Sequence, residues 1–108
     1  MTNNLFYIKN AHKINNIKLK AFVLGFGKLK KSELAYDNCE LTKLINQKLS
    51  NSPENSSVLL KLNYAHQQYH KDAENIIEIN KSKPKEAMIL LNKLKDNSHF
   101  IIEEISKF

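Results

Sequence analysis

The sequence of 108 residues has very little of several residue types that usually define a fold or a function. It contains one cysteine, two glycines, two prolines and no tryptophan, and all 17 of its basic residues are lysine. One cysteine cannot form an internal disulfide, which excludes the disulfide-stabilised class of small secreted domains and favours a reducing cytoplasm. The scarcity of glycine and proline favours a few long helices over many short strands.

Long hydrophobic runs are also missing. No apolar stretch approaches the roughly 20 residues that a transmembrane helix needs. The start, Met1-Thr2-Asn3-Asn4, lacks the basic and then apolar order of a signal peptide. Apolar residues nevertheless make up 42% of the chain, which is enough for one core. We therefore expect a single domain over residues 1–108 that is cytoplasmic and has no membrane partner.

The net charge of +6 is strongly basic, but its distribution does not favour nucleic acid. The lysines are spread along the whole chain, and the tightest group is Lys28, Lys30 and Lys31. Arginine, which makes bidentate contacts with guanine edges and phosphates, is absent. We interpret the lysines as solvated helix surfaces and predict no nucleic-acid partner.

Apolar residues recur at steps of three and four in several segments, as they do on one face of a helix. The first segment spans about residues 5–24 and is stopped by the two glycines. A shorter helix is expected to start near Asp37 or Asn38, whose side chains can cap a helix, and to run through Lys48. Residues 49–57 read as the clearest loop.

Two further helices are expected in the second half of the chain. Within the loop, Ser52-Pro53-Glu54 is a helix-start signal for a segment over about 53–81, and Pro84 starts the last segment.

The inward positions of the first segment are Leu5, Ile8, His12, Asn15, Leu19, Phe22 and Phe26. Those of the 53–81 segment are Leu59, Leu62, His66, Tyr69, Ala73, Ile76 and Asn80. Those of the last segment are Ala87, Leu91, Leu94, Ser98, Ile101, Ile105 and Phe108. The sequence therefore predicts an all-α antiparallel four-helix bundle, with three long helices and a shorter one carrying the cysteine.

Three of the four histidines fall on the predicted interior, and His70 does so because the face that it shares with His66 continues through Ala73 and Ile77. His66 and His70 are four residues apart, so both imidazoles project from one face of a helix and can reach one metal ion. His12 occupies an inward position of the first helix. Buried imidazoles without partners cost a few kcal/mol in lost hydration. The fourth, His99, is expected on the solvent face.

The single cysteine completes this set. Cys39 lies close to the expected start of the short helix, where the helix dipole and exposed amides favour a thiolate. Three imidazoles and one thiolate are a full tetrahedral ligand set for zinc with no vacancy for water. Such a set favours a structural or regulatory site over hydrolytic catalysis, and no nucleophile–base pair or phosphate-binding loop is present, so no enzyme is expected. Taken singly, His12 is more often a hydrogen-bonded core residue and Cys39 a small hydrophobe.

These residues match the pattern of the chemoreceptor zinc-binding (CZB) family, a bacterial cytoplasmic domain. The family pattern has a histidine in the first helix, a cysteine opening a short motif, and a His-x-x-x-His pair in a later helix, here His12, Cys39 and His66-Gln67-Gln68-Tyr69-His70. The segment Lys83–Leu94 also resembles the last helix of the family. The cysteine motif departs from the family at Thr42 and Leu44.

The resemblance implies a four-helix bundle that binds one zinc ion through His12, Cys39, His66 and His70. It further implies a regulatory domain that conveys zinc level or oxidant exposure in chemotaxis or cyclic-di-GMP control, with Cys39 as the redox-sensitive residue. The implied partners are a second copy in a homodimer and a signalling output protein, either a chemoreceptor or a diguanylate cyclase-like protein. Such a chain is either a stand-alone member of the family or a fragment of a longer protein.

Two other functions remain open from the sequence. One is a metal-free helical adaptor whose lysine-rich surface docks on an acidic protein partner. The other is a zinc buffer or carrier, which requires rapid exchange of the metal with an external acceptor.

Overall fold

Four α-helices and no β-strand make up the part of the chain that the computed structural model describes, residues 2–51 and 56–107. The helices are α1 (Thr2–Val23), α2 (Glu40–Asn51), α3 (Ser56–Ile79) and α4 (Pro84–Ile105). Two short 3₁₀ turns, η1 (Lys31–Leu34) and η2 (Tyr36–Asn38), connect α1 to α2. The predicted all-α fold, with three long helices and one shorter one, is confirmed.

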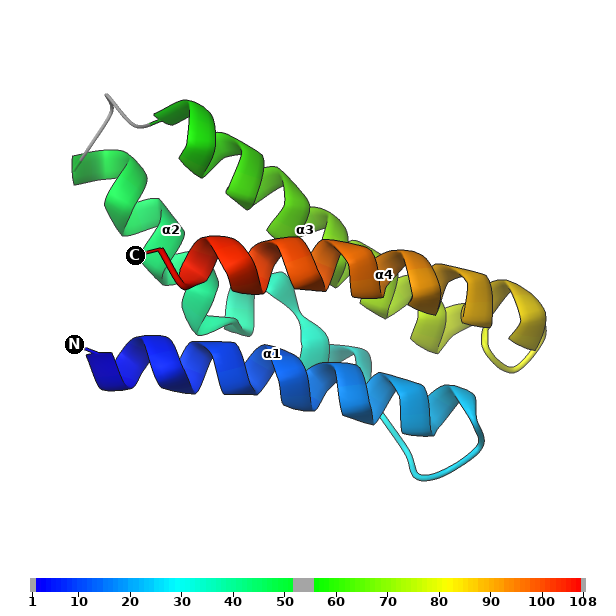
Figure 1. Cartoon of the computed structure of the whole chain (residues 1–108). Coiled ribbons are helices and arrows are strands. Elements are labelled where there is room, and N and C mark those ends of the chain that lie inside the picture. Colours follow the sequence, from blue (N-terminus) through cyan, green and yellow to red (C-terminus); the bar gives the residue numbers. More distant parts are fainter. Residues whose placement is uncertain (1, 52–55, 108) are drawn as a thin grey trace.

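Consecutive helices run in opposite directions, and the chain begins and ends at the same end of the bundle (Figure 1). The largest helix contact joins α3 and α4, and α1 packs against both of them. The short helix α2 and the two 3₁₀ turns pack mainly on α3. No helix in the described segments is long and apolar enough to cross a membrane.

The predicted inward positions form the observed core. In α4 the buried residues are the predicted ones: Ala87, Leu91, Leu94, Ser98, Ile101 and Ile105. In α3 the buried predicted residues are Leu59, Leu62, His66, Tyr69, Ala73 and Ile76. Phe108 lies outside the described residues. The prediction is wrong for Phe26, which is 70% exposed, because Gly25 and Gly27 adopt positive φ angles and turn the chain away from the bundle.

The boundaries of α2 differ from the prediction. The helix begins at Glu40 rather than near Asp37 or Asn38, because those residues form η2 instead. The hydroxyl of Thr42 donates a hydrogen bond to the carbonyl oxygen of Tyr36 at 2.6 Å and so ties the start of α2 back to η2. The helix also continues to Asn51, so the first residues of the predicted 49–57 loop are helical, and Ser52-Pro53-Glu54 lie outside the described residues.

A polar chain crosses the core and connects three helices. The hydroxyl of Tyr69 on α3 donates to Oδ1 of Asn16 on α1 at 2.7 Å. The amide of Asn16 in turn donates to the hydroxyl of Ser98 on α4 at 2.7 Å. Satisfied polar chains of this kind fix the relative register of the elements they join, because any slip leaves a buried group unpaired.

Candidate metal centre

The four predicted ligands come together in the middle of the bundle. His66 and His70 lie one turn apart on α3, His12 lies on α1, and Cys39 lies between η2 and α2. The three histidines are at most 2% exposed, whereas Cys39 is half-buried. One ligand atom from each of the four residues lies within 4.8 Å of all the others. This cluster is compatible with binding a metal ion.

The Nε2 atoms of the histidines are the atoms that converge on the sulfur and on each other. The sulfur of Cys39 lies 3.6 Å from Nε2 of His12 and 3.4 Å from Nε2 of His66. Nε2 of His66 lies 2.9 Å from Nε2 of His70. Residues from two helices and a connecting segment thus present nitrogen and sulfur atoms to one common point.

Backbone carbonyl groups set the orientation of two of the rings. Nδ1 of His12 donates to the carbonyl oxygen of Ile8 at 3.0 Å, and Nδ1 of His70 donates to that of Leu34 at 2.7 Å. Because a carbonyl oxygen only accepts, each of these neutral rings carries its proton on Nδ1 and presents a lone pair on Nε2. Outer partners of this kind are what fix ligand histidines in metal sites.

His66 lacks such an outer partner. Its Nδ1 is buried and has no hydrogen-bond partner. Because His70 presents a lone pair, His66 donates through Nε2 to His70 in the metal-free molecule, and the thiol hydrogen of Cys39 is left to donate to His12. The space between the four potential ligand atoms therefore contains only two hydrogen atoms, one on Nε2 of His66 and one on the sulfur of Cys39.

Burial keeps the histidines neutral. Burial lowers the pKa of His12 to about 4, and the hydrogen bond to the Ile8 carbonyl opposes this effect only weakly. Burial also lowers the pKa of His66 to about 2, and repulsion between the protonated forms of His66, His70 and His12 acts in the same direction. The pKa of His70 is lowered for the same reason. Neutral imidazoles are the form that binds metals, so burial prepares these three side chains as ligands.

The expectation for the cysteine is corrected by the structure. Burial raises the pKa of the Cys39 thiol, although the backbone N–H groups of Leu41 and Thr42 at the start of α2 act in the opposite direction. The predicted effect of the helix terminus is thus present but smaller than the cost of removing a thiolate from water. Without a nearby cation, Cys39 is held as a neutral thiol.

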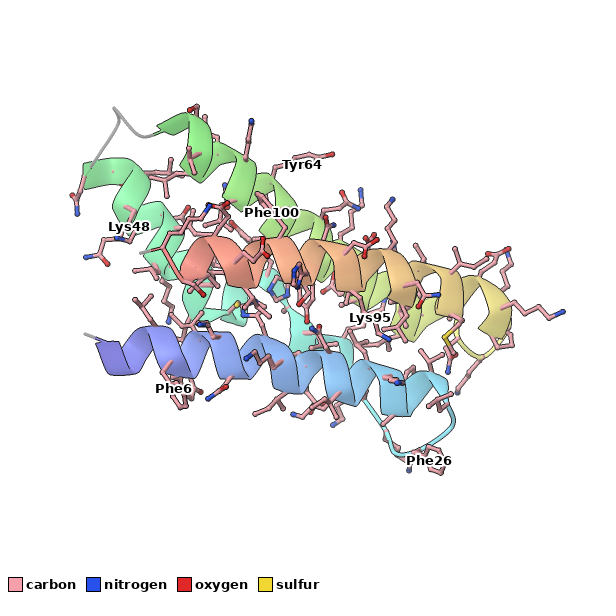
Figure 2. All side chains as sticks on the ribbon, viewed as in Figure 1. Phe6, Phe26, Lys48, Tyr64, Lys95 and Phe100 are labelled. Carbon is pink, nitrogen blue, oxygen red and sulfur yellow. The ribbon has the colours of Figure 1, made fainter. Side chains whose placement is uncertain are left out.

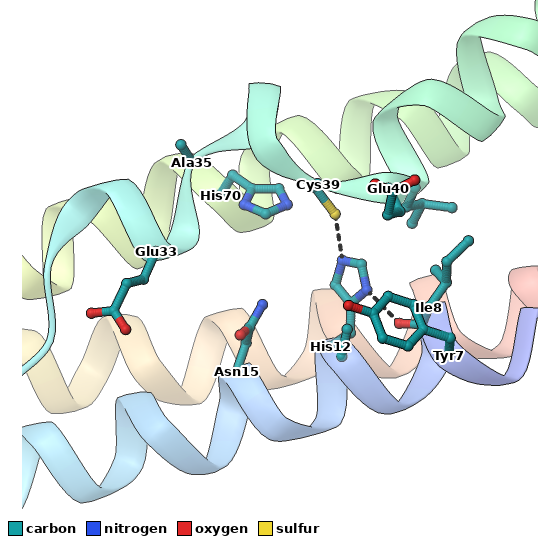
Figure 3. Close-up of a pocket in the computed structure, with 11 residues that line it drawn as sticks. Tyr7, Ile8, His12, Asn15, Glu33, Ala35, Cys39, Glu40 and His70 are labelled. Carbon is teal, nitrogen blue, oxygen red and sulfur yellow. Dashed lines mark hydrogen bonds between the residues drawn. The ribbon is translucent and has the colours of Figure 1, made fainter. Parts of the chain in front are cut away.

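A pocket of about 190 Å³ connects the cluster to the molecular surface. Figure 3 shows Cys39, His12 and His70 at this pocket, together with Tyr7 and Asn15 of α1. Glu33, Ala35 and Glu40 also line it. Three of the four clustered side chains can therefore be reached by a small molecule or ion from one side.

Sequence reasoning missed Tyr36, whose ring packs against the rings of His66 and His70. Tyr36 in η2 places its ring 5.2 Å from the His66 ring and 5.9 Å from the His70 ring, and its hydroxyl donates to Oδ1 of Asn63 on α3. No pattern in the sequence indicated this contact, because η2 has no periodicity. The remaining histidine, His99, is on the surface as expected. Its side chain is 78% exposed, and its Nε2 lies 3.0 Å from Oε1 of Glu103.

Comparisons of this chain with family models, curated proteins and solved structures find no match. The function of the chain is therefore inferred from the residues of this site.

Proposed function

We propose that this chain is a regulatory domain that binds one zinc ion through His12, Cys39, His66 and His70. The observation that carries the proposal is the convergence of three buried imidazole nitrogens and the sulfur of the half-buried Cys39 within 4.8 Å of one another. Three nitrogens and one sulfur fill a tetrahedral zinc site and leave no position for a substrate water. The ligand set therefore favours regulation or structural support over hydrolysis.

Several of the distances are compatible with a tetrahedral metal ion such as zinc. Zinc bonds of about 2.0–2.1 Å to nitrogen and 2.3 Å to sulfur place neighbouring nitrogen and sulfur ligands about 3.6 Å apart and nitrogen pairs about 3.3 Å apart. The observed separations of 3.6 and 3.4 Å between sulfur and nitrogen agree with the first value. The 2.9 Å between His66 and His70 is the spacing of a hydrogen bond, and it widens by a few tenths of an ångström when that hydrogen is lost.

Binding requires two changes in protonation. The thiol of Cys39 must lose its proton, and His66 must move its proton from Nε2 to Nδ1. A bound zinc ion would supply the positive charge that stabilises the Cys39 thiolate, which burial alone disfavours. His12 and His70 need no change, because carbonyl groups already hold their protons on Nδ1.

The resemblance to the chemoreceptor zinc-binding family supports the finer part of the proposal. We propose that the domain belongs to that family and conveys zinc level or oxidant exposure to a signalling output protein. Cys39 is the group on which an oxidant acts, and the pocket brings solvent to its side chain. Hydrogen peroxide converts such a thiol to a sulfenic acid with release of water, and the product is a poorer metal ligand than a thiolate.

The decisive experiment is the metal content of the protein purified under reducing conditions. We expect about one zinc ion per chain by elemental analysis, and a large loss in His66→Ala. The matched control is His99→Ala, which removes a surface histidine and leaves the zinc content unchanged. A metal-free wild-type protein that takes up no added zinc contradicts the proposal and favours the metal-free adaptor.

A further inference from the structure

Helix α1 has a second apolar face that the bundle does not use. Its buried face holds Ile8, His12 and Leu19. On the opposite side lie Tyr7, Ile14 and Ile17, which are 64%, 50% and 68% exposed. Leu24, which is 52% exposed, follows the last residue of α1 and still donates its backbone N–H to the carbonyl oxygen of Lys20. Isolated exposed apolar residues are ordinary on a protein surface. Three of them along one side of α1, with a fourth directly after its last turn, are not isolated.

The spacing of this surface is that of a helix–helix contact. The positions Tyr7, Asn10, Ile14, Ile17, Ala21 and Leu24 follow steps of 3, 4, 3, 4 and 3. We call these six residues the outer seam. Steps of three and four sustained in this way are the a and d positions of a heptad, which bring a second helix to lie nearly parallel along the first. Figure 2 shows Phe6, which borders the outer seam, on the side of α1 that faces away from α4.

Charges beside the outer seam select the kind of helix that fits it. Lys13 and Lys20 border one edge and Lys18 the other, all three are exposed, and the sequence of α1 contains no acidic residue. These lysines occupy the flanking e and g positions, which set partner choice in helix pairs. A partner helix with glutamate or aspartate at its own flanking positions is attracted, and one with lysine there is repelled.

We propose that the outer seam of α1 is the docking surface for an amphipathic helix of a partner protein that has apolar a and d positions and acidic flanking positions. A second copy of this chain is disfavoured at this surface, because pairing two α1 helices in either direction sets lysine against lysine. The acidic helix also lies beside the metal site, since Tyr7 belongs both to the outer seam and to the wall of the pocket. The proposal does not depend on whether the chain binds a metal.

A pair of synthetic peptides tests this with the full chain. One peptide has three heptads with leucine or isoleucine at a and d and glutamate at e and g, and the other has lysine at e and g. Fluorescence anisotropy should show that the glutamate peptide binds at least about tenfold more tightly than the lysine peptide. The double change Lys13→Glu with Lys20→Glu should reverse this preference.

Apolar variants locate the contact. Ile17→Ser should weaken binding of the glutamate peptide by about tenfold, since it removes one buried isoleucine from the complex. Ile89→Ser is the matched control, because Ile89 lies on α4 and is 67% exposed against 68% for Ile17. Both variants should keep the melting curve and zinc content of the wild type, since neither side chain is in the core.

Three outcomes overturn the proposal. Equal peptide affinity in the two serine variants places the binding elsewhere. A dimer in sedimentation that Ile17→Ser dissociates identifies a second copy as the occupant. Binding to vesicles of phosphatidylcholine and phosphatidylserine without binding to the glutamate peptide identifies an anionic membrane instead. None of these results depends on zinc, so a protein that fails to bind zinc leaves this test intact.

Discussion

His66 differs from the other two histidines of the site in what surrounds its outer nitrogen. His12 and His70 each donate Nδ1–H to a backbone carbonyl, whereas Nδ1 of His66 is buried without a partner. A ligand without an outer partner is less firmly oriented and less basic than one that has it. Among the three histidines, His66 is therefore the one whose ring is held mainly by packing, against Tyr36 and the other two imidazoles.

Cys39 should contribute most to the selectivity and strength of the site. Cys39→Ser should lower zinc affinity by at least about a hundredfold, since losses of ten- to hundredfold already follow from removing an outer partner of a ligand. Cobalt(II) gives a spectroscopic readout, because cobalt bound by a thiolate has a charge-transfer absorption that a hydroxyl ligand does not produce. We expect this absorption in the wild type and in His99→Ala, and its disappearance in Cys39→Ser. An unchanged spectrum in the serine variant would exclude Cys39 as a ligand.

Zinc binding should release about one proton from the protein near neutral pH. The thiol of Cys39 is protonated because burial raises its pKa, while His12 and His66 are already neutral with pKa values of about 4 and about 2. The number of protons follows from titration calorimetry in buffers with different ionisation enthalpies. In Cys39→Ala the released proton should be absent. Release of two or more protons from the wild type would contradict the assignment of neutral histidines.

At the scale of elements, the connection between α1 and α2 is the part of the site that a bound metal would hold most directly. The segment from η1 to Cys39 contributes the sulfur of the cluster and the Leu34 carbonyl that orients His70. It packs on α3 through two 3₁₀ turns, whose hydrogen-bond geometry is poorer than that of an α-helix. The long helices α3 and α4, by contrast, are held by an extensive apolar contact that needs no metal.

Removal of zinc should therefore loosen this connection and leave the long helices in place. In a chelator, amide hydrogen exchange should become faster over residues 31–42 and change little over the central turns of α3 and α4. Peptide-resolved exchange with mass spectrometry measures the difference directly. Uniformly faster exchange across all four helices would show instead that the metal supports the whole bundle.

The polar chain through the core makes a separate prediction about how the helices are held together. Tyr69→Phe removes the hydroxyl that donates to Asn16 and leaves a part-buried acceptor unpaired, so it should lower the free energy of unfolding by about 1–2 kcal/mol. Tyr64→Phe is the control, because Tyr64 lies on the same helix and is 69% exposed. Urea unfolding of both variants gives the two values, and equal stabilities would mean that the chain of hydrogen bonds contributes nothing.

At the scale of the whole molecule, three neutral histidines in the interior make the metal-free bundle sensitive to acid. Their pKa values in the folded state lie below the ordinary value of 6.5, at about 4 for His12 and about 2 for His66. The unfolded chain then binds more protons than the folded chain below pH 6.5, so unfolding becomes more favourable as the pH falls. Above pH 6.5 both states are neutral at these positions and this effect vanishes.

We therefore expect the urea midpoint of the metal-free protein to decline steadily from pH 6.5 to pH 4. His12→Asn should flatten that decline, because it removes one of the groups that titrates only on unfolding. A midpoint independent of pH over this range would contradict burial of neutral imidazoles.

The sequence by itself determined the helices, their inward faces and the four candidate ligands. Periodicity of three and four is a local property, so the six buried positions of α4 could be predicted without knowing what they contact. The same rule placed His12, His66 and His70 inside, and the count of one cysteine singled out Cys39. Helix boundaries were predicted less well: Asp37 lies in η2, and α2 begins at Glu40. The hydroxyl of Thr42 donates a hydrogen bond to the carbonyl oxygen of Tyr36 at this boundary.

Only the tertiary structure decided how those residues meet and what state they are in. The carbonyls that orient His12 and His70, the unpaired nitrogen of His66 and the raised pKa of Cys39 all depend on which atoms face each side chain in the folded chain. The outer seam of α1 likewise could not be identified as exposed from the sequence, because only the packed bundle shows which of the two apolar faces of α1 is buried. Burial and hydrogen bonding across elements are non-local, and a pattern along one helix cannot specify them.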